Sequence, residues 1–251
     1  MGNNIQNQKC VASSKYWNDH WPEKKFSIAS SRHPIRRWIE SEVRATTKAD
    51  VFEIGCYPGK FLAVFGELGY TLNGIDSFSK TNPAMSDWLK NEGYKIGQFY
   101  QSDFLNFSSK QQYDIVCSFG FIEHFKNWEE VLINHIRLTK DGGHIIIDVP
   151  NLKSPLYYFL YKIFEPEVLK NHEFSAMNKE TIKTVFRNNG CTVEAAMYLS
   201  RFHFRFVTKQ SWPFTVIEKC INSFGLLLEL LPKSIYARYI AVSAIKELSN
   251  R

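Results

Sequence analysis

The chain has 251 residues, of which 44% are hydrophobic and 22% are charged, so it can bury a sizeable core within one α/β domain. Its five cysteines are widely spread and form no C-x-x-C pair, which excludes a disulfide framework and a structural zinc site. The polar start MGNNIQNQKC lacks the apolar stretch of a secretory signal. These features predict a cytoplasmic protein.

Positive charge gathers at the two ends of the chain. Residues 1–50 carry nine Lys and Arg against five Asp and Glu, and residues 195–251 carry eight against three. The middle carries fourteen against seventeen, and the net charge is +6. If the ends meet in the fold, they form a basic rim that suits an anionic substrate or a membrane surface; otherwise they are two solvated faces. No Lys and Arg run with interleaved aromatic residues indicates a nucleic-acid partner.

Strands alternate with helices after an N-terminal helical segment. The stretch HPIRRWIESEV predicts a helix with Pro34 in its first turn. Short apolar, β-prone stretches predict strands at 50–55, 71–76, 97–102, 113–118 and 144–149. Helical patterns lie between them at 59–67, 83–91 and 128–138. The alternation predicts a Rossmann-like, doubly wound α/β fold, in which helices cover both faces of a mostly parallel sheet.

The stretch VFEIGCYPGK, at the end of the first predicted strand, has the pattern of a ligand-binding turn. Gly55 and Gly59 allow a tight turn with bare backbone, and the helix that follows points its free N–H groups at the ligand. A dinucleotide fingerprint fails here because Tyr57 and Lys60 occupy two of its glycine positions. Glu53 would repel a pyrophosphate, so it favours a ligand with a cationic ammonium group.

Acidic residues follow two further strands. Asp76 ends the second strand, where a carboxylate can accept hydrogen bonds from both ribose hydroxyls. Asp103 follows the third strand and can accept from an adenine amine, while Phe104 offers a face against the ring. The alternatives are a helix cap for Asp76 and a turn residue for Asp103.

From residue 50 to about 150 the chain resembles the class I S-adenosylmethionine-dependent methyltransferases. The resemblance rests on E-x-G-x-x-x-G at 53–59, the strand-ending Asp76, S-D-F at 102–104, Y-D-I-V followed by E-H-F, and K-D-G-G-H. Tyr57 replaces a glycine that the family usually has in this turn, and its side chain could cover the methionine part of the cofactor. The resemblance implies cofactor contacts at Glu53, Gly55, Cys56, Tyr57, Gly59, Asp76, Ser77, Asp103, Phe104 and Ser118.

Methyl transfer to a hydroxyl also needs a base. His124 lies at the end of the fourth strand, where the transferable methyl should point, and histidine titrates near neutral pH. His172 is the second candidate, because its segment could fold over the site, whereas His144 is predicted to be structural. Some relatives that methylate quinone hydroxyls bind a metal through an additional acid three residues before the Glu-His pair. Gly120 occupies that position here, so we predict no metal.

Residues 151–251 are predicted to form the acceptor side of the same single domain, after N-terminal helices (1–49) and a cofactor-binding core (50–150). The aromatic stretch 154–178 suggests a cap, 179–190 a helix, and 191–199 with 238–246 an antiparallel hairpin. Within the insertion 199–235, one helical face carries Val216, Ile217, Cys220, Ile221, Phe224, Leu227, Leu228 and Leu231. Because charged residues interrupt it, this helix should not span a bilayer. It would face the core or a second copy of the chain, or lie on a membrane surface.

Residues 148–182, with DVPN after the fifth strand and MNKETI at the start of a helix, resemble the corresponding part of methyltransferases that modify bacterial surface-polysaccharide or other glycan precursors. This implies O-methylation of a sugar or a phosphate-linked sugar, an anionic acceptor that the basic chain ends would suit. A lipid-like or quinone acceptor is the alternative, favoured by the aromatic cap, and C-methylation stays open because E-H-F also occurs in cyclopropane-forming relatives. A scaffold without turnover stays open too, since Tyr57 could plug the pocket.

Overall fold

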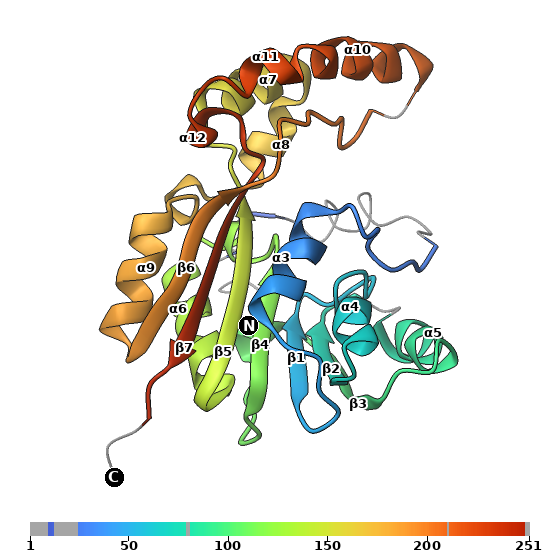
Figure 1. The fold of residues 1–251 in the computed structure, drawn as a ribbon, viewed down its shortest axis with the longest axis vertical. Coiled ribbons are helices and arrows are strands. Elements are labelled where there is room, and N and C mark those ends of the chain that lie inside the picture. Colours follow the sequence, from blue (N-terminus) through green and yellow to red (C-terminus); the bar gives the residue numbers. More distant parts are fainter. Residues whose placement is uncertain (1–9, 13–24, 79–80, 210, 249–251) are drawn as a thin grey trace, which may run out of the picture.

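A seven-stranded sheet forms the centre of the computed structural model, which describes residues 10–12, 25–78, 81–209 and 211–248 (Figure 1). The strand order is β3-β2-β1-β4-β5-β7-β6. The strands are β1 (Asp50–Ile54), β2 (Thr71–Asp76), β3 (Ile96–Gln101), β4 (Tyr113–Phe119), β5 (Thr139–Pro150), β6 (Cys191–Leu199) and β7 (Tyr239–Lys246). The polar start of the chain, apart from residue 10, lies outside the described residues.

Every predicted strand is present, and the mixed direction of the sheet is confirmed. β1 to β5 pair in parallel, whereas β7 runs antiparallel to both β5 and β6, as the predicted closing hairpin requires. β5 begins at Thr139, earlier than the apolar pattern indicates, because the Lys140–Gly143 turn sequence also joins the strand. The strand order reverses between β1 and β4, and ligands bind at the carboxyl ends of the strands beside such a switch point.

Helices cover both faces of the sheet and bury two separate apolar clusters. On one face lie α3 (Pro34–Glu42), α4 (Leu62–Glu67) and α5 (Ser86–Asn91), and on the other lie α6 (Trp128–Leu138) and α9 (Lys179–Asn188) (Figure 1). The predicted helices at 33–43, 59–67, 83–91, 128–138 and 179–190 are thereby confirmed, with a π-helical turn (η1, Thr81–Met85) preceding α5. This two-faced packing holds the strand ends in fixed positions.

The remaining helices form an upper lobe (residues 151–170 and 200–238) at the carboxyl ends of the strands (Figure 1). They are α7 (Pro155–Phe164), α8 (Pro166–Lys170), α10 (Trp212–Ser223), α11 (Gly225–Leu228) and α12 (Lys233–Tyr236). α7 begins at a proline that follows the N-cap Ser154, whose Oγ accepts a hydrogen bond from the N–H of Tyr157. The lobe is therefore assembled from two segments that lie far apart in the sequence.

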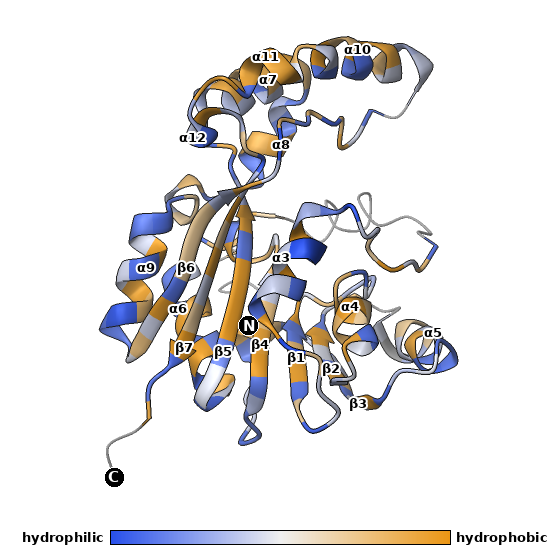
Figure 2. Ribbon diagram, in the orientation of Figure 1, coloured by the Kyte–Doolittle hydropathy of each residue, from blue (hydrophilic) through white to orange (hydrophobic). Residues whose placement is uncertain are grey.

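The amphipathic helix predicted in the insertion is interrupted. The chain turns at Phe224, and α10 contains no buried residue. Of the eight apolar residues on the predicted face, Ile217, Ile221 and Leu228 are half-buried against the core, while the other five are exposed. The predicted contact with the core is therefore made by part of this face only, while other hydrophobic residues of α10 and α11, helices that Figure 2 colours partly as hydrophobic, stay exposed. Among the described residues, none of the helices has both the length and the apolar character needed to cross a bilayer.

Candidate active site

A cavity of about 1220 Å³ opens at the carboxyl ends of β1, β2, β4 and β5, beneath the upper lobe. Its lining combines strand-end residues of the sheet with Tyr157 and Tyr161 of α7 and with Arg205 of the second lobe segment. Pockets for a single small molecule measure about 300 to 1,000 Å³, so this cavity has room for two ligands side by side.

The turn after β1 forms one wall of the cavity. Gly55 has φ +72°, and a Cβ at this position would lie 2.5 Å from Cδ2 of Phe121, so only glycine fits. Gly59 has φ +79° and packs against Met85 and Trp88 of the neighbouring helix. Both predicted glycines therefore serve the backbone path of the turn.

Glu53 lies below this turn and is poised for a cation. Its side chain is buried and its Oε2 has no hydrogen-bond partner. Burial, and next the charge of Asp76, raise the pKa of Glu53 well above its usual range, although the N–H of Leu62 acts in the opposite direction. A buried carboxyl with a free oxygen is stabilised by a positively charged ligand group.

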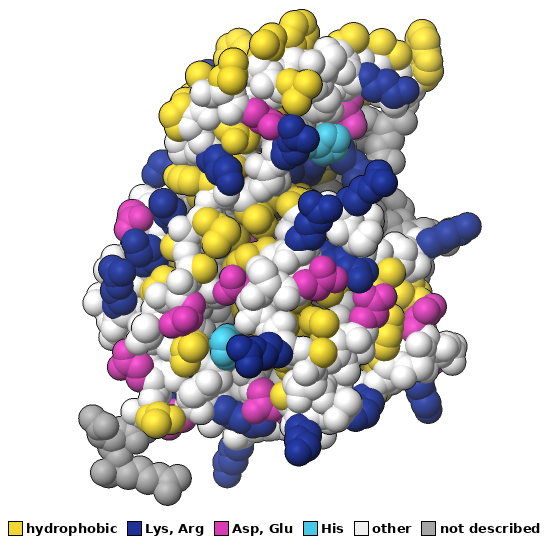
Figure 3. Space-filling model, viewed as in Figure 1, with side chains coloured by type: hydrophobic (Ala, Val, Ile, Leu, Met, Phe, Trp, Pro, Cys, Tyr) yellow, Lys and Arg dark blue, Asp and Glu magenta, His cyan; other side chains and the backbone are white. Residues whose placement is uncertain are grey.

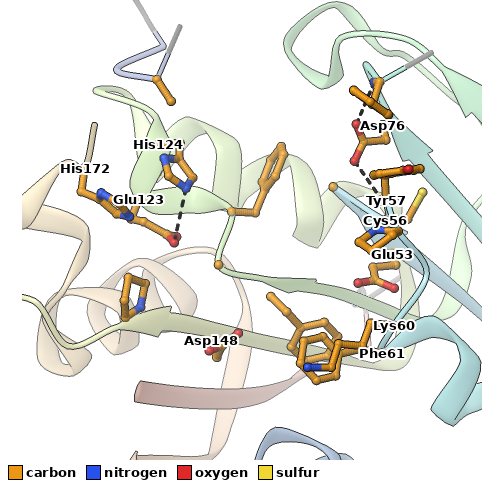
Figure 4. A pocket seen from close by; sticks show the side chains of 18 of the residues that line it. Glu53, Cys56, Tyr57, Lys60, Phe61, Asp76, Glu123, His124, Asp148 and His172 are labelled. Carbon is orange, nitrogen blue, oxygen red and sulfur yellow. Dashed lines mark hydrogen bonds and ion pairs between the residues drawn. The ribbon is translucent and has the colours of Figure 1, made fainter. Parts of the chain in front are cut away.

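Asp76 lies at the end of β2 and is held in place by the backbone. Its Oδ2 accepts the N–H of Tyr57 at 3.0 Å, and its Oδ1 accepts the N–H of Phe78 at 2.8 Å (Figure 4). Because each carboxylate oxygen can accept a second hydrogen bond, both remain available to ribose hydroxyls. The Tyr57 ring packs on Phe78, with centroids 4.4 Å apart, so it forms part of the wall and leaves the cavity open.

The adenine-side predictions have mixed outcomes. Asp103 and Phe104 line the cavity, and Asp103 also caps a short helix by accepting the N–H of Leu105 at 3.0 Å. Cys56 and Ser77 line it as well. Ser118 does not: it is fully buried, and its Oγ pairs with Nε2 of His135 at 3.0 Å. That prediction is corrected, because this residue of β4 points toward α6 and away from the cavity.

Two acids that line the cavity were not predicted as site residues from the sequence. Glu123 and Asp148 are buried, and each has one carboxyl oxygen without a partner. Burial raises the pKa of Asp148 to about 8, although the N–H of Gly120 and the charge of Arg238 lower it. Asp148 lies near the end of the buried strand IIIDVP, which is the same signal that identified Asp76.

The two candidate bases meet although they lie far apart in the chain. Nδ1 of His124 lies 2.8 Å from the carbonyl oxygen of Asn171, which is 47 positions later and directly precedes His172. Nδ1 of His172 lies 2.6 Å from the carbonyl oxygen of Val168, and the imidazole centroids are 4.6 Å apart (Figure 4). Since a carbonyl only accepts, each Nδ1 carries a proton, and in the neutral form of each ring Nε2 is the nitrogen with the lone pair. Burial lowers the pKa of His172 to about 4.

The same group offers a candidate metal site. A carboxylate oxygen of Glu123 and one nitrogen each of His124 and His172 lie within 4.8 Å of one another, and Nε2 of His124 is 3.8 Å from Oε1 of Glu123. Two imidazoles and a carboxylate could hold a divalent cation. The expected absence of a metal, which rested on Gly120, therefore stays a prediction.

Basic residues from both ends of the chain also line the cavity. Lys25 comes from the N-terminal part, Lys60 follows the turn, and Arg205 and Arg238 belong to the upper lobe. On the face shown in Figure 3, Lys and Arg side chains gather where the lobe meets the rest of the molecule. Lys25 from the first fifty residues thus lines the same cavity as Arg205 and Arg238, which is one of the two arrangements that the charge distribution left open. No motif marks these individual residues in the sequence.

Comparisons with known proteins agree with this geometry. Residues 23–196 match the family model described as a methyltransferase domain. A ubiquinone biosynthesis O-methyltransferase of Rickettsia felis is 25% identical over 150 residues, which are 58% of this chain and 60% of the relative. The chain thus spans about 60% of the length of that curated relative.

Solved structures share the fold. A magnesium protoporphyrin IX methyltransferase of Synechocystis with bound S-adenosylhomocysteine is 12% identical, with a TM-score of 0.57 over 85% of this chain and 80% of that chain. A SAM-dependent methyltransferase of Archaeoglobus fulgidus is 20% identical, with a TM-score of 0.55 over 84% of this chain and 93% of that chain. With its strand order, its glycine turn and its family match, the chain belongs to the methyltransferase-domain family and has the Rossmann-like fold of S-adenosylmethionine-dependent methyltransferases.

Proposed function

We propose that this enzyme methylates a hydroxyl oxygen of a small-molecule acceptor and that His124 is the general base. The observation that carries the proposal is the position of His124 in the cavity lining, with its Nδ1 2.8 Å from the Asn171 carbonyl oxygen and its Nε2 3.8 Å from Oε1 of Glu123. An imidazole with this tautomer can take a proton at Nε2 without turning its ring. His172 is the alternative base, with the same tautomer and a half-buried side chain.

The residues at the other side of the cavity fit S-adenosylmethionine. The free Oε2 of buried Glu53 matches an ammonium group, and the Asp76 carboxylate matches a ribose diol. When bound, this cofactor supplies an electrophilic methyl carbon on a sulfonium sulfur. Glu53, Asp76 and the two turn glycines would orient it, and the aromatic side chains around the cavity would exclude water.

Glu123 would assist the proton transfer. Its Oε1 lies 3.8 Å from Nε2 of His124, and burial raises the pKa of this carboxyl well above its usual range. The proton taken from the acceptor hydroxyl would stay on Nε2 of His124, and an ionised Glu123 carboxylate would stabilise the resulting imidazolium, whose positive charge in turn favours that ionised form. Deprotonation would make the acceptor oxygen the nucleophile for in-line displacement at the methyl carbon.

Our first candidate for the acceptor is a sugar or a phosphate-linked glycan precursor, which suits the unpaired basic residues of the cavity. A quinone-type or lipid-like acceptor is the second candidate. It is favoured by Tyr157, Tyr161, Phe121 and Phe125 in the lining and by the relatives that act in ubiquinone biosynthesis.

The test is a methyl-transfer assay with labelled S-adenosylmethionine and two acceptor panels, phosphorylated sugars and hydroxylated quinols, analysed by mass spectrometry for one added methyl group. Thermal melting with and without S-adenosylhomocysteine is measured first, to establish binding. A ligand at 100 times its dissociation constant should stabilise the fold by about 2.7 kcal/mol. Methyl transfer only to carbon or nitrogen atoms would contradict the proposal.

A further inference from the structure

Three basic side chains in the cavity have no acidic partner among the described residues. Neither Lys60, Arg205 nor Arg238 takes part in a side-chain hydrogen bond or ion pair within the described part of the chain. Two of these side chains lie over aromatic rings. Lys60 Nζ is 5.3 Å from the Phe61 ring centroid, and Arg238 Cζ is 5.5 Å from the Tyr239 ring centroid. Cations that converge without a counter-charge are typical of a site for an anionic ligand.

In the segment RFHFRFV, at 201–207, exposed and buried side chains alternate, and this alternation puts Arg205 on the exposed side. Phe202, Phe204 and Phe206 are buried in the upper lobe, so the alternate residues Arg201, His203 and Arg205 point outward. Of these three outward residues, Arg205 alone lines the cavity. The three buried phenylalanines thus fix the segment in the upper lobe, and the side chain of Arg205 is available to bind a ligand in the cavity.

This segment is held rigidly. Tyr161 Oη donates to the carbonyl oxygen of Arg205 at 3.1 Å, and the N–H of His203 donates to Tyr157 Oη at 3.2 Å. The buried carboxylate of Glu165 accepts the N–H of Val207 at 2.7 Å and the N–H of Thr208 at 2.6 Å. A segment fixed by this many hydrogen bonds offers its arginine at low entropic cost.

Arg238 and Lys60 complete the group from two other elements. Arg238 immediately precedes β7, and its backbone is fixed because Ser200 Oγ accepts its N–H at 3.0 Å. Burial, and then the positive charges of Arg205 and Arg238, lower the pKa of Lys60, so both arginines lie within electrostatic reach of Lys60. His33 adds no charge near neutral pH, because burial and the charges of Lys60 and Arg238 lower its pKa to about 4.

We propose that Lys60, Arg205 and Arg238 form a subsite that binds an oxyanion of the acceptor, a phosphate or a carboxylate. The proposal rests on the methyl transfer proposed above and narrows its acceptor to an anionic molecule. Two acids, Glu218 and Asp148, are within electrostatic reach of Arg238, and neither forms an ion pair with it within the described residues. Glu218 uses Oε2 to accept the N–H of Phe206 at 3.1 Å.

The carboxylate of S-adenosylmethionine is the other oxyanion that could reach these cations, so the experiment separates the two sources. Inorganic phosphate is titrated by calorimetry into the protein saturated with S-adenosylhomocysteine, and S-adenosylhomocysteine is titrated separately. The variants are Arg238→Gln and Arg205→Gln, the latter at an exposed position where folding is at little risk. Arg187→Gln, an exposed arginine of α9 outside the cavity, is the matched control.

We expect phosphate to bind the cofactor-loaded protein, and its dissociation constant to rise about tenfold in Arg238→Gln and several-fold in Arg205→Gln, with no change in the control. The affinity for S-adenosylhomocysteine should stay within twofold. Loss of that affinity in both variants would instead assign the cations to the cofactor carboxylate and overturn the proposal, as would absent phosphate binding to a protein that still binds S-adenosylhomocysteine. If the wild-type protein bound no S-adenosylhomocysteine at all, the proposed function itself would have failed.

Discussion

The cavity has an acidic wall and a basic wall, and the chain builds them differently. The acidic wall (Glu53, Asp76, Glu123 and Asp148) comes from the ends of β1, β2 and β5 and from the turn after β4. The basic wall (Lys60, Arg205 and Arg238) comes from three segments with no shared pattern. In the proposed function, Glu53 and Asp76 of the first wall suit the cationic groups and ribose of the cofactor and the second wall suits an anionic acceptor, so the polarity of the cavity would help to sort its two ligands.

The largest expected effect comes from His124, the proposed general base, which belongs to neither the acidic wall nor the basic wall. His124→Ala should lower turnover about 10²- to 10⁴-fold, because general-base catalysis supplies a factor of this size, and should leave cofactor affinity nearly unchanged. Steady-state rates on the acceptor found in the panel, with calorimetry on S-adenosylhomocysteine, measure both quantities. His144→Ala, in β5 and outside the cavity, is the control. Near-wild-type turnover in His124→Ala would move the base assignment to His172.

The next effect tests the acidic wall alone. Asp76→Ala removes a carboxylate that should accept two ribose hydroxyls, and hydrogen bonds to charged groups are worth about 1.5 to 3 kcal/mol, so cofactor affinity should fall at least tenfold. Phosphate binding at the basic wall should not change. Asp76→Asn tests charge alone while keeping an acceptor for the Tyr57 N–H, and Asp87→Ala, at an exposed site outside the cavity, is the control. Normal cofactor affinity in Asp76→Ala would refute the ribose assignment.

Asp148 should make the stability of the cofactor-free protein depend on pH. Because burial raises its folded pKa to about 8 from an ordinary value of 3.8, the folded protein holds a proton that the unfolded chain releases between these values. The free energy of unfolding should therefore fall as pH rises from about 4 to about 8. One kcal/mol shifts Tm by about 2 to 4 °C at this size, and Asp148→Asn should raise Tm at pH 8 by at least about 3 °C, with little change at pH 5.

Thermal melting of both proteins across this pH range measures the effect, with Asp87→Asn as the control. Glu53 and Glu123 stay in the variant and act in the same direction, since burial raises the pKa of both. The pH dependence should thus weaken without vanishing. An equal Tm change at pH 5 and pH 8 would mean that packing, and not ionisation, distinguishes Asp148→Asn from the wild type.

The smallest expected effect concerns metal. Dialysis against a chelator should leave turnover within about twofold, because the proposed proton transfer uses imidazole Nε2 directly. The control is the same dialysis followed by addition of Mg²⁺ or Zn²⁺. A large loss that a divalent cation restores would assign Glu123, His124 and His172 to a metal site, and the general base would then have to be sought elsewhere.

Local patterns accounted for the scaffold and for two of the four residues of the acidic wall, Glu53 and Asp76. Gly55 and Gly59 could be recognised because a positive φ and a close contact leave no alternative to glycine, and Asp76 because it ends a buried strand. The same rule could have identified Asp148. It failed for Ser118, because the pattern gave the end of β4 but not the face toward which the side chain points.

The sequence alone determined the strand and helix succession, the direction of the sheet and the glycine turn after β1, because periodicity and turn chemistry are local properties of the chain. Only the tertiary structure decided which distant residues meet. The approach of His172 to His124 depends on how residues 171–173 pack against the turn after β4, where the N–H of Glu173 donates to the carbonyl oxygen of Glu123. Likewise, Lys60, Arg205 and Arg238 converge because α7 anchors the 201–207 segment over the sheet, a long-range packing outcome that no local pattern encodes.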